Sequence, residues 1–479
     1  MSDDELASFP APEVGTLARL ETGVARLDPI LSGGFHRGGT YLVCGAPGSG
    51  KTILANQLCF ERARRGDTVV YVTFLAESHS RMLLHLQPFA FFDREQVGKN
   101  VHYVSGFSIL EKGGFPAVRQ LVHQLLKRYE PTVIVFDGAQ AFRGFASSEI
   151  GFQRFLRELQ AVGTMSGCTL LILLPDTGEG SGVDLVDGVI ELTMRDFGPR
   201  TVRELSPRKF RGGPSLLGRH EVEIGRNGIV VHPRTEIVFA SPAEADPEER
   251  VRVPFGLPPL DAMLDGGVLS GSSTVLLGAP GTGKTVLGLH FLAEGARRGE
   301  PGVYFGFYET PPRLMAKADA LGIDLRRALD EGRLELQWQP PLETNLDALA
   351  ERLLERIAAR GARRLRLFID GVAGFRDAAI YPERLERFFA ALTHRLREHD
   401  VTTLLSDETA LFADSIDLPR RELAAIVENI VYLRQSERED EVRHSLVILK
   451  ARESAYDPRV RAFRIRQHGI ELSPPGGAS

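Results

Sequence analysis

Two eight-residue stretches have the composition and spacing of a phosphate-binding loop: GAPGSGKT at 45–52 and GAPGTGKT at 278–285. In this pattern the closely spaced glycines let the backbone turn tightly, so that its amide groups point at phosphate oxygens while the lysine reaches the terminal phosphates. A plain Gly-rich turn is the alternative. Both stretches, however, follow an apolar run and precede a helical pattern, which is the context that the motif requires. The sequence therefore predicts two nucleotide-binding sites.

The threonine that ends each loop, Thr52 or Thr285, is predicted to offer its hydroxyl group to a Mg²⁺ ion that accompanies the nucleotide. The residues predicted to bind the nucleotide are Gly45, Ala46, Pro47, Gly48, Ser49, Gly50, Lys51, Thr52, Gly278, Ala279, Pro280, Gly281, Thr282, Gly283, Lys284 and Thr285.

The two loops belong to an internal repeat. Four pairs of residues are each separated by 233 positions: Lys51 and Lys284, Asp28 and Asp261, Gly66 and Gly299, Asp137 and Asp370. A constant separation from about residue 23 to residue 142 indicates an ungapped duplication of one nucleotide-binding domain. The predicted organisation is a flexible N-terminus (1–15), a first domain (16–239), a Pro- and acid-rich linker (240–250), a second domain (251–472) and a short tail (473–479).

Composition limits the classes of partner. The chain has 479 residues, 43% of them hydrophobic, which is ordinary for a globular protein. A net charge of −5 gives no electrostatic footprint for nucleic acid. No run of about 18 apolar residues occurs and the N-terminus lacks an apolar core, so we expect no membrane segment and a cytoplasmic location.

Cysteine and arginine use adds two expectations. The three cysteines, Cys44, Cys59 and Cys168, lack metal-binding spacing and lie in apolar surroundings, which predicts buried thiols in a reducing compartment. The Arg-rich stretches 363–366 and 461–466 are predicted to be solvated faces or subunit contacts.

The remaining pattern predicts an α/β fold, with a mainly parallel central sheet flanked by helices in each domain. The near-continuous apolar runs TVIVFD (132–137) and RLRLFID (364–370) are typical of buried parallel strands. They end in Asp137 and Asp370, which we expect to face the nucleotide and hold the Mg²⁺ shell. A helix cap or turn is the alternative for a single aspartate, but the identical offset from two phosphate loops favours the metal role.

Together these elements resemble the KaiC family of tandem RecA-like ATPases. The resemblance rests on LSGGFHRGGT and LDGGVLSGSS before the loops, EPGVYFGFYETPPRLM after the second loop, the strand-terminal aspartates and a basic pair near the end of each domain. It extends from about Gly23 to Ile470. It implies two RecA-like P-loop domains that bind ATP between the subunits of a hexameric double ring, together with an unidentified regulatory partner protein.

The resemblance also assigns catalytic glutamates. The family places two glutamates after the strand that follows the first helix, and the second copy has Tyr308 and Glu309 there. Glu309 is therefore the predicted base for the attacking water. The same register in the first copy gives Leu75 and Ala76, with Glu77 one position later. Glu77 is either a catalytic base or a solvated carboxylate at a strand end.

The basic pairs are Lys209 with Arg211 and Lys450 with Arg452. The resemblance implies that each pair reaches across a subunit interface to the γ-phosphate of the neighbour. An edge strand protected by charge is the alternative.

The predicted function is that of an ATP-binding and ATP-hydrolysing ring protein with a regulatory or signalling role. A serine/threonine autokinase is one alternative, although Ala424 and Ala425 stand where the family's clock members carry the phosphorylated hydroxyls, leaving Ser406, Thr409 and Ser415 as other acceptors. A scaffold held together by bound ATP is another. DNA strand handling is disfavoured, because no strand-binding groove of interleaved basic and aromatic residues is present.

Overall fold

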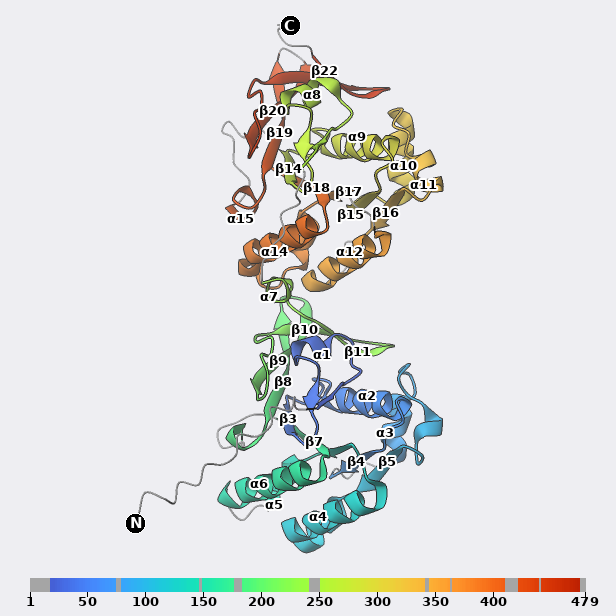
Figure 1. Ribbon diagram of the computed structural model, residues 1–479, viewed down its shortest axis with the longest axis vertical. Helices are drawn as coiled ribbons and strands as arrows, with labels where there is room; N and C mark the ends of the chain where they lie inside the picture. The colour runs from blue at the N-terminus through green and yellow to red at the C-terminus, as the bar shows by residue number, and fades with distance from the viewer. Residues whose placement is uncertain are drawn as a thin grey trace, which may run out of the picture. The chain divides into compact units, whose positions relative to one another are not determined.

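The computed structural model describes residues 18–74, 79–145, 149–175, 183–240, 250–340, 344–361, 364–409, 421–438 and 441–473. The chain forms two compact units, Met1–Arg234 and Thr235–Ser479. Figure 1 follows the chain through both units by colour. Each unit is described by itself.

The first unit is built on a sheet with nine strands among its described residues, in the order β11-β10-β9-β8-β3-β7-β6-β4-β5. The strands β3 to β8 pair in parallel with one another, and β9 to β11 continue the sheet as antiparallel strands. Their bounds are β3 Thr40–Cys44, β4 Val69–Thr73, β5 Val101–Ser105, β6 Val133–Asp137, β7 Thr169–Leu174, β8 Gly188–Phe197, β9 Arg200–Phe210, β10 His220–Gly225 and β11 Gly228–His232. A small pair, β1 Arg19–Leu20 and β2 Phe35–His36, precedes the sheet.

The second unit repeats this topology strand for strand. Its sheet has the order β16-β15-β17-β18-β14-β19-β20-β21-β22, so β14 to β22 stand in the places of β3 to β11. Their bounds are β14 Ser273–Gly278, β15 Gly302–Gly306, β16 Leu334–Trp338, β17 Leu365–Asp370, β18 Val401–Glu408, β19 Asn429–Arg438, β20 Glu441–Ala451, β21 Arg461–Arg466 and β22 Gly469–Leu472. The pair β12 Arg252–Val253 and β13 Val268–Leu269 corresponds to β1 and β2.

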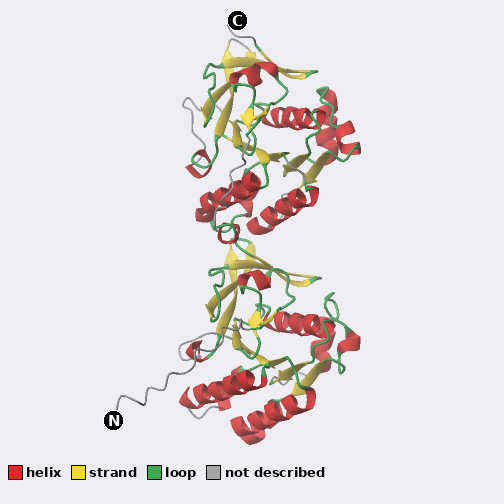
Figure 2. Cartoon of the chain, viewed as in Figure 1, coloured by secondary structure: helices red, strands yellow, loops and turns green. Residues whose placement is uncertain are grey.

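Helices cover both faces of each sheet (Figure 2). In the first unit, α1 Leu27–Ile30, α2 Lys51–Arg64 and α3 His79–Leu86 pack on one face, and α4 Phe107–Tyr129, α5 Gln140–Phe145 and α6 Glu149–Ser166 on the other. In the second, α8 Pro258–Met263, α9 Lys284–Arg297, α10 Pro311–Ala320 and α11 Arg326–Asp330 face α12 Leu346–Arg360, α13 Ala373–Ala378, α14 Leu385–Glu398 and α15 Arg421–Ala424 across the sheet. Strands covered on both faces bury every side chain, which explains the continuous apolar run of β3. The predicted α/β fold is confirmed.

Two further expectations from composition can be compared with this fold. All three cysteines are free and buried, as predicted. None of the helices in the described part of the chain combines the length and the apolar composition that a membrane span needs.

Parallel pairing brings the predicted chemical groups to one end of each sheet. In the second unit, Asp370 at the end of β17 lies opposite Gly306 of β15 and Ser406 of β18. Gly278, which ends β14 and begins the phosphate loop, lies opposite Glu408. The ends of β14, β15, β17 and β18 therefore form one surface, where parallel α/β sheets bind their ligands.

A short helix, α7 Thr235–Val238, packs with the second unit although it precedes the predicted linker. The amide and hydroxyl groups of Thr235 both donate to Asp347 Oδ1 at 2.9 Å. Arg384 donates to both carboxylate oxygens of Glu236 (2.8 and 2.9 Å) and to Asp347 at 3.0 Å. Asp347 is completely buried, so these donors replace the water that its carboxylate loses on folding. Residues 241–249 of the predicted linker lie outside the described residues.

The prediction for the Arg-rich stretches is wrong for two of their members. Arg366 is only 1% exposed, because it lies in a strand that both helix layers cover. Its guanidinium group donates to Glu300 Oε2 at 2.6 Å and to two backbone carbonyls, which offsets part of the cost of burying the charge. Arg461 is 8% exposed and pairs with Asp457 at 2.8 Å.

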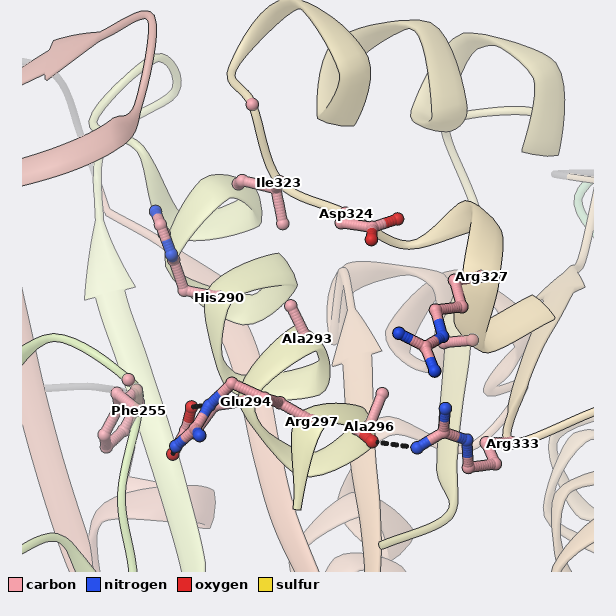
Figure 3. A pocket seen from close by; sticks show the side chains of 13 residues that line it. Phe255, His290, Ala293, Glu294, Ala296, Arg297, Ile323, Asp324, Arg327 and Arg333 are labelled. Carbon is pink, nitrogen blue, oxygen red and sulfur yellow. Dashed lines mark hydrogen bonds and ion pairs between the residues drawn. The ribbon is translucent and has the colours of Figure 1, made fainter. Parts of the chain in front are cut away.

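The two units differ in packing at the tenth residue of their first long helix. In α2 this residue is Phe60, which is fully buried, with its ring centroid 5.2 Å from that of Phe92. In α9, which has the same length, it is Ala293. A cavity of about 410 Å³ opens there, lined also by His290, Glu294 and Arg333 (Figure 3). It borders the second half of α9, whereas the phosphate loop precedes the first residue of that helix, so the cavity is not the nucleotide site.

Replacing Phe60 with alanine should therefore leave a void at the same place in the first unit. The residues that line the cavity of the second unit are not there to line this void. We expect Phe60→Ala to lower the stability of this unit by about 3–5 kcal/mol. Hydrogen–deuterium exchange of α2 in increasing urea would measure the change in the full chain. Leu84→Ala, at a side chain that is 60% exposed, is the control and should change stability by less than about 0.5 kcal/mol. Equal effects of the two substitutions would contradict the packing role of Phe60.

Candidate functional site

The two predicted phosphate loops place the same two glycines in the left-handed region of φ. Each connects a central strand to the helix that begins with its lysine, Lys51 or Lys284. Gly48 and Gly50 have φ values of 81° and 106°, and the corresponding glycines of the second loop, Gly281 and Gly283, have values of 80° and 94°. Residues with side chains rarely adopt these positive φ values, so glycine is required for the amide groups to turn inward.

Each lysine lies folded over its own loop. Lys284 Nζ donates to the carbonyl oxygens of Gly278 (2.7 Å) and Ala279 (2.9 Å), and Lys51 makes the matching contacts with Gly45 and Ala46. Burial lowers the pKa of both lysines, while nearby carboxylates oppose the shift. The ammonium group is therefore held where the terminal phosphates of a nucleotide would bind.

The loop threonines and the strand-terminal aspartates meet in both units. Thr52 Oγ1 donates to Asp137 Oδ2 at 3.1 Å, and Thr285 Oγ1 donates to Asp370 Oδ2 at 3.0 Å. Burial raises the pKa of Asp370, and hydrogen bonds from Ser406, Thr285 and Tyr304 partly offset the effect. A hydroxyl and a carboxylate oxygen side by side are ligands that Mg²⁺ accepts, with phosphates and water completing its shell. The described ranges hold no group of three or more His, Cys, Asp or Glu residues arranged for a metal ion.

Two tyrosines at this site were not predicted from the sequence. Tyr71 OH donates to Asp137 Oδ2 at 2.7 Å and Tyr304 OH donates to Asp370 Oδ2 at 3.0 Å. Burial raises the pKa of each phenol, so both remain neutral hydrogen-bond donors. The available signal was their separation of 233 positions, equal to that of the two loops.

Glu309 follows β15 and lies beside this cluster. Burial is the largest cause of the raised pKa of Asp370, and the nearby negative charge of Glu309 raises it further. One carboxylate oxygen, Oε1, forms an ion pair with Lys317 of α10. The other, Oε2, is buried and has no hydrogen-bond partner among the residues that the structure describes.

Glu77 lies outside the described residues, but the helices that follow change its alignment. In α3 the buried residues are Met82 and Leu86, and in α10 they are Leu314 and Ala318. These pairs are separated by 232 positions rather than 233, so the first copy has one additional residue between β4 and α3. With this shift Glu77, and not Ala76, is the counterpart of Glu309.

The basic pairs lie toward the other end of the sheet. Lys450 pairs with Ile430 of β19, which in turn lies opposite Val275 near the start of β14. The phosphate loop begins at Gly278, which is three residues after Val275 and therefore about 10 Å away along the strand. The first unit has the same arrangement, with Lys209 opposite Val189 and Val189 opposite Leu42. The structure therefore does not bring either basic pair to the phosphate loop of its own unit.

Comparison with known proteins places this geometry in a family. The family model for KaiC ATPases matches residues 20–236 and 253–477. The chain belongs to the KaiC family of ATPases. It is 24% identical over 480 residues to the circadian clock protein KaiC3 of Synechocystis sp. (strain ATCC 27184 / PCC 6803 / Kazusa), covering 97% of this chain and 93% of that protein. It is 23% identical over 469 residues to the circadian clock oscillator protein KaiC of Picosynechococcus sp. (strain ATCC 27264 / PCC 7002 / PR-6), covering 95% and 89%.

The KaiC-family assignment directs attention to the hydroxyl groups considered as phosphate acceptors. Ser406 is 3% exposed, donates to Asp370 Oδ1 at 2.8 Å and accepts from the amide of Gly371. Its hydroxyl group therefore orients the aspartate. Ser415 lies outside the described residues, and Thr409 directly follows β18. Ala424 and Ala425 offer only their carbonyl groups, to Lys450 and Arg452.

Removing the tyrosine hydroxyls should weaken the metal site while leaving the fold intact. We expect Tyr304→Phe to lower the Mg²⁺ affinity of the second site about tenfold, because the metal-binding carboxylate loses a group that orients it. Isothermal titration of Mg²⁺ into the ATP-loaded protein would measure the loss. Tyr41→Phe is the matched control, since this buried hydroxyl accepts from the His36 amide and does not contact either aspartate. Equal Mg²⁺ affinity in both variants would contradict the role of Tyr304.

Proposed function

We propose that this chain is a cytoplasmic, ATP-hydrolysing ring protein, in which ATP bound by each unit lies between neighbouring subunits of a homohexamer and the nucleotide state regulates a partner protein. The observation that carries the proposal is the arrangement of the second unit. Lys284, Thr285, Asp370 and Glu309 converge at one end of the sheet, whereas the basic pair lies toward the other.

The residues of one subunit supply most of the reaction. The loop amides and Lys284 bind the phosphates, and Thr285 and Asp370 would hold Mg²⁺, which when bound neutralises charge on the phosphates. Glu309 accepts a proton from the attacking water while the water oxygen bonds to the γ-phosphorus and the bond to the ADP oxygen breaks. ADP and inorganic phosphate leave, and the glutamate returns its proton to solvent. By its aligned position, Glu77 performs the same step in the first unit.

In the second unit the lysine of the basic pair is held more firmly than the arginine. Lys450 Nζ donates to the carbonyl oxygens of Ala424 (2.7 Å) and Val427 (2.6 Å), which holds the end of α15. Arg452 is exposed and makes one bond, at 3.2 Å, to Ala425. In the first unit Lys209 and Arg211 both contact the Asp184 carbonyl. We therefore assign Arg452 and Arg211 as the groups that reach the neighbour's γ-phosphate, with Lys450 and Lys209 as their supports.

The regulatory role rests on the relatives, which are named as circadian clock proteins. A nucleotide-dependent ring can expose or hide a binding surface as its sites cycle between ATP and ADP. An autokinase is less well supported, since alanines stand at the acceptor positions and the buried Ser406 is already bonded to Asp370. A non-hydrolysing scaffold would not need Glu309 beside the metal-binding cluster.

Substitution of the two glutamates tests the hydrolytic step. Glu309→Gln keeps the side-chain shape but removes the base, so we expect kcat of the second unit to fall about 10²- to 10⁴-fold with ATP affinity retained. Glu77→Gln should do the same for the first unit. Phosphate release by the two single variants and by the double variant separates the contributions. A double variant that turns over as fast as wild type would contradict both assignments.

Mixing of subunits tests the role of Arg452 in a neighbouring site. Lys284→Ala and Arg452→Ala are each expected to abolish turnover in the second ring, when both are built on Glu77→Gln to silence the first. In mixed rings, an Arg452→Ala subunit binds ATP and receives the arginine from a Lys284→Ala neighbour. Random mixing should restore about a quarter of the parent rate. A mixture no faster than its separate components would contradict catalysis across the interface.

A further inference from the structure

The ion pair between Glu309 and Lys317 is not explained by nucleotide binding or by the family motifs described above. Lys317 lies on α10, and its ammonium group contacts Glu309 Oε1. The two side chains are 35% and 27% exposed. An ion pair this exposed contributes little to stability, so its significance lies in where it holds the glutamate.

Lys317 lies on a rigid helix, whereas Glu309 lies in the connection that precedes it. The side chains of Leu314 and Ala318 are fully buried and fix α10 against the core, and Lys317 immediately precedes Ala318. Glu309 lies between β15 and α10, outside both elements. A glutamate in such a connection samples several rotamers unless another group restricts it. The lysine supplies that restriction.

The contact with Lys317 uses only one of the two carboxylate oxygens of Glu309. Glu309 Oε2 is shielded from solvent and makes no hydrogen bond within the described part of the chain. Burying a carboxylate oxygen without a hydrogen-bond partner costs free energy, unless a bound ligand donates the missing hydrogen bond. The attacking water is a ligand of the required kind, because it donates a hydrogen bond.

We propose that Lys317 is a positioning residue for hydrolysis in the second unit: it binds one oxygen of Glu309 so that the other faces the attacking water. The inference rests on the proposed role of Glu309 as the base. It predicts that loss of the lysine slows the chemical step while ATP binding stays normal, because Lys317 contacts the base and not the phosphate loop.

The position that matches Lys317 in the first unit does not hold a permanent cation. In the register set by the buried residues of α3 and α10, Lys317 corresponds to His85, which is exposed. A histidine is a cation only when protonated, whereas a lysine is charged at all physiological pH values. The two repeats therefore differ at this position of the helix, although their phosphate loops carry the same motif.

The test uses the full chain carrying Glu77→Gln, so that hydrolysis reports the second unit alone. In this background we expect Lys317→Met to lower kcat about tenfold and to leave KM for ATP within about twofold. Lys317→Arg should recover most of the loss, since it restores a cation of similar length. Lys317→His should resemble the methionine variant above neutral pH. Arg326→Met, which removes the surface ion pair with Asp319, is the matched control and should leave both parameters unchanged.

The outcomes separate the inference from the proposal on which it rests. If the Glu77→Gln chain hydrolyses no more ATP than the Glu77→Gln, Glu309→Gln double variant, second-unit hydrolysis is absent and both fail. If the background is active and Lys317→Met matches it, the positioning role alone fails. A faster Lys317→Met variant would show that the ion pair restrains the base and would also overturn the inference. Retained ATP binding in each variant confirms that the fold is intact.

Discussion

The hydroxyl–carboxylate contact between Thr285 and Asp370, repeated by Thr52 and Asp137, is the interaction on which the whole site depends. Thr285 belongs to α9, which follows β14 and its loop, and Asp370 ends β17, which is not a neighbour of β14 because β18 lies between them. They meet only if all three strands keep their parallel register. A slip of one residue in β17 would turn Asp370 to the opposite face. Contacts from Tyr304 and Ser406 on the two flanking strands hold the aspartate in that register.

Duplication has kept the phosphate loop and the hydroxyl–carboxylate cluster beside it and has changed the residues around them. The loops, the threonine, the aspartate and the tyrosine have matching geometry in both units. The second unit adds Ser406 where the first has the apolar Leu173, and Ala293 where the first has Phe60. Both units therefore share the arrangement at the phosphate loop and differ in the side chains packed around it.

Local sequence signals were sufficient for the strand–loop–helix context of the two loops and for the buried strands that end in Asp137 and Asp370, because loop composition and buried apolar runs act over a few residues. These signals were insufficient where the position of a residue depends on pairing between segments that are distant in the sequence. The ungapped register hid the additional residue before α3 and so separated Glu77 from Glu309. Charge alone suggested a solvated surface for Arg366, whose burial follows from a helix that packs over its strand. The distance of Lys450 from its own loop appears only once β19 and β20 are paired.

That distance has a consequence for assembly. If Arg452 acts on phosphate, it acts on that of another subunit, so a single chain holds two incomplete sites. The face that carries the phosphate loop must then meet the face that carries β20, and two different faces in contact form a heterologous interface. Repeated around an axis, such an interface closes into a ring and leaves no site unpaired. In such a ring, hydrolysis at one site would remove the γ-phosphate that the neighbour's arginine contacts. Turnover and subunit contact would then be coupled through the same side chain, so that a change of nucleotide state becomes a change of shape.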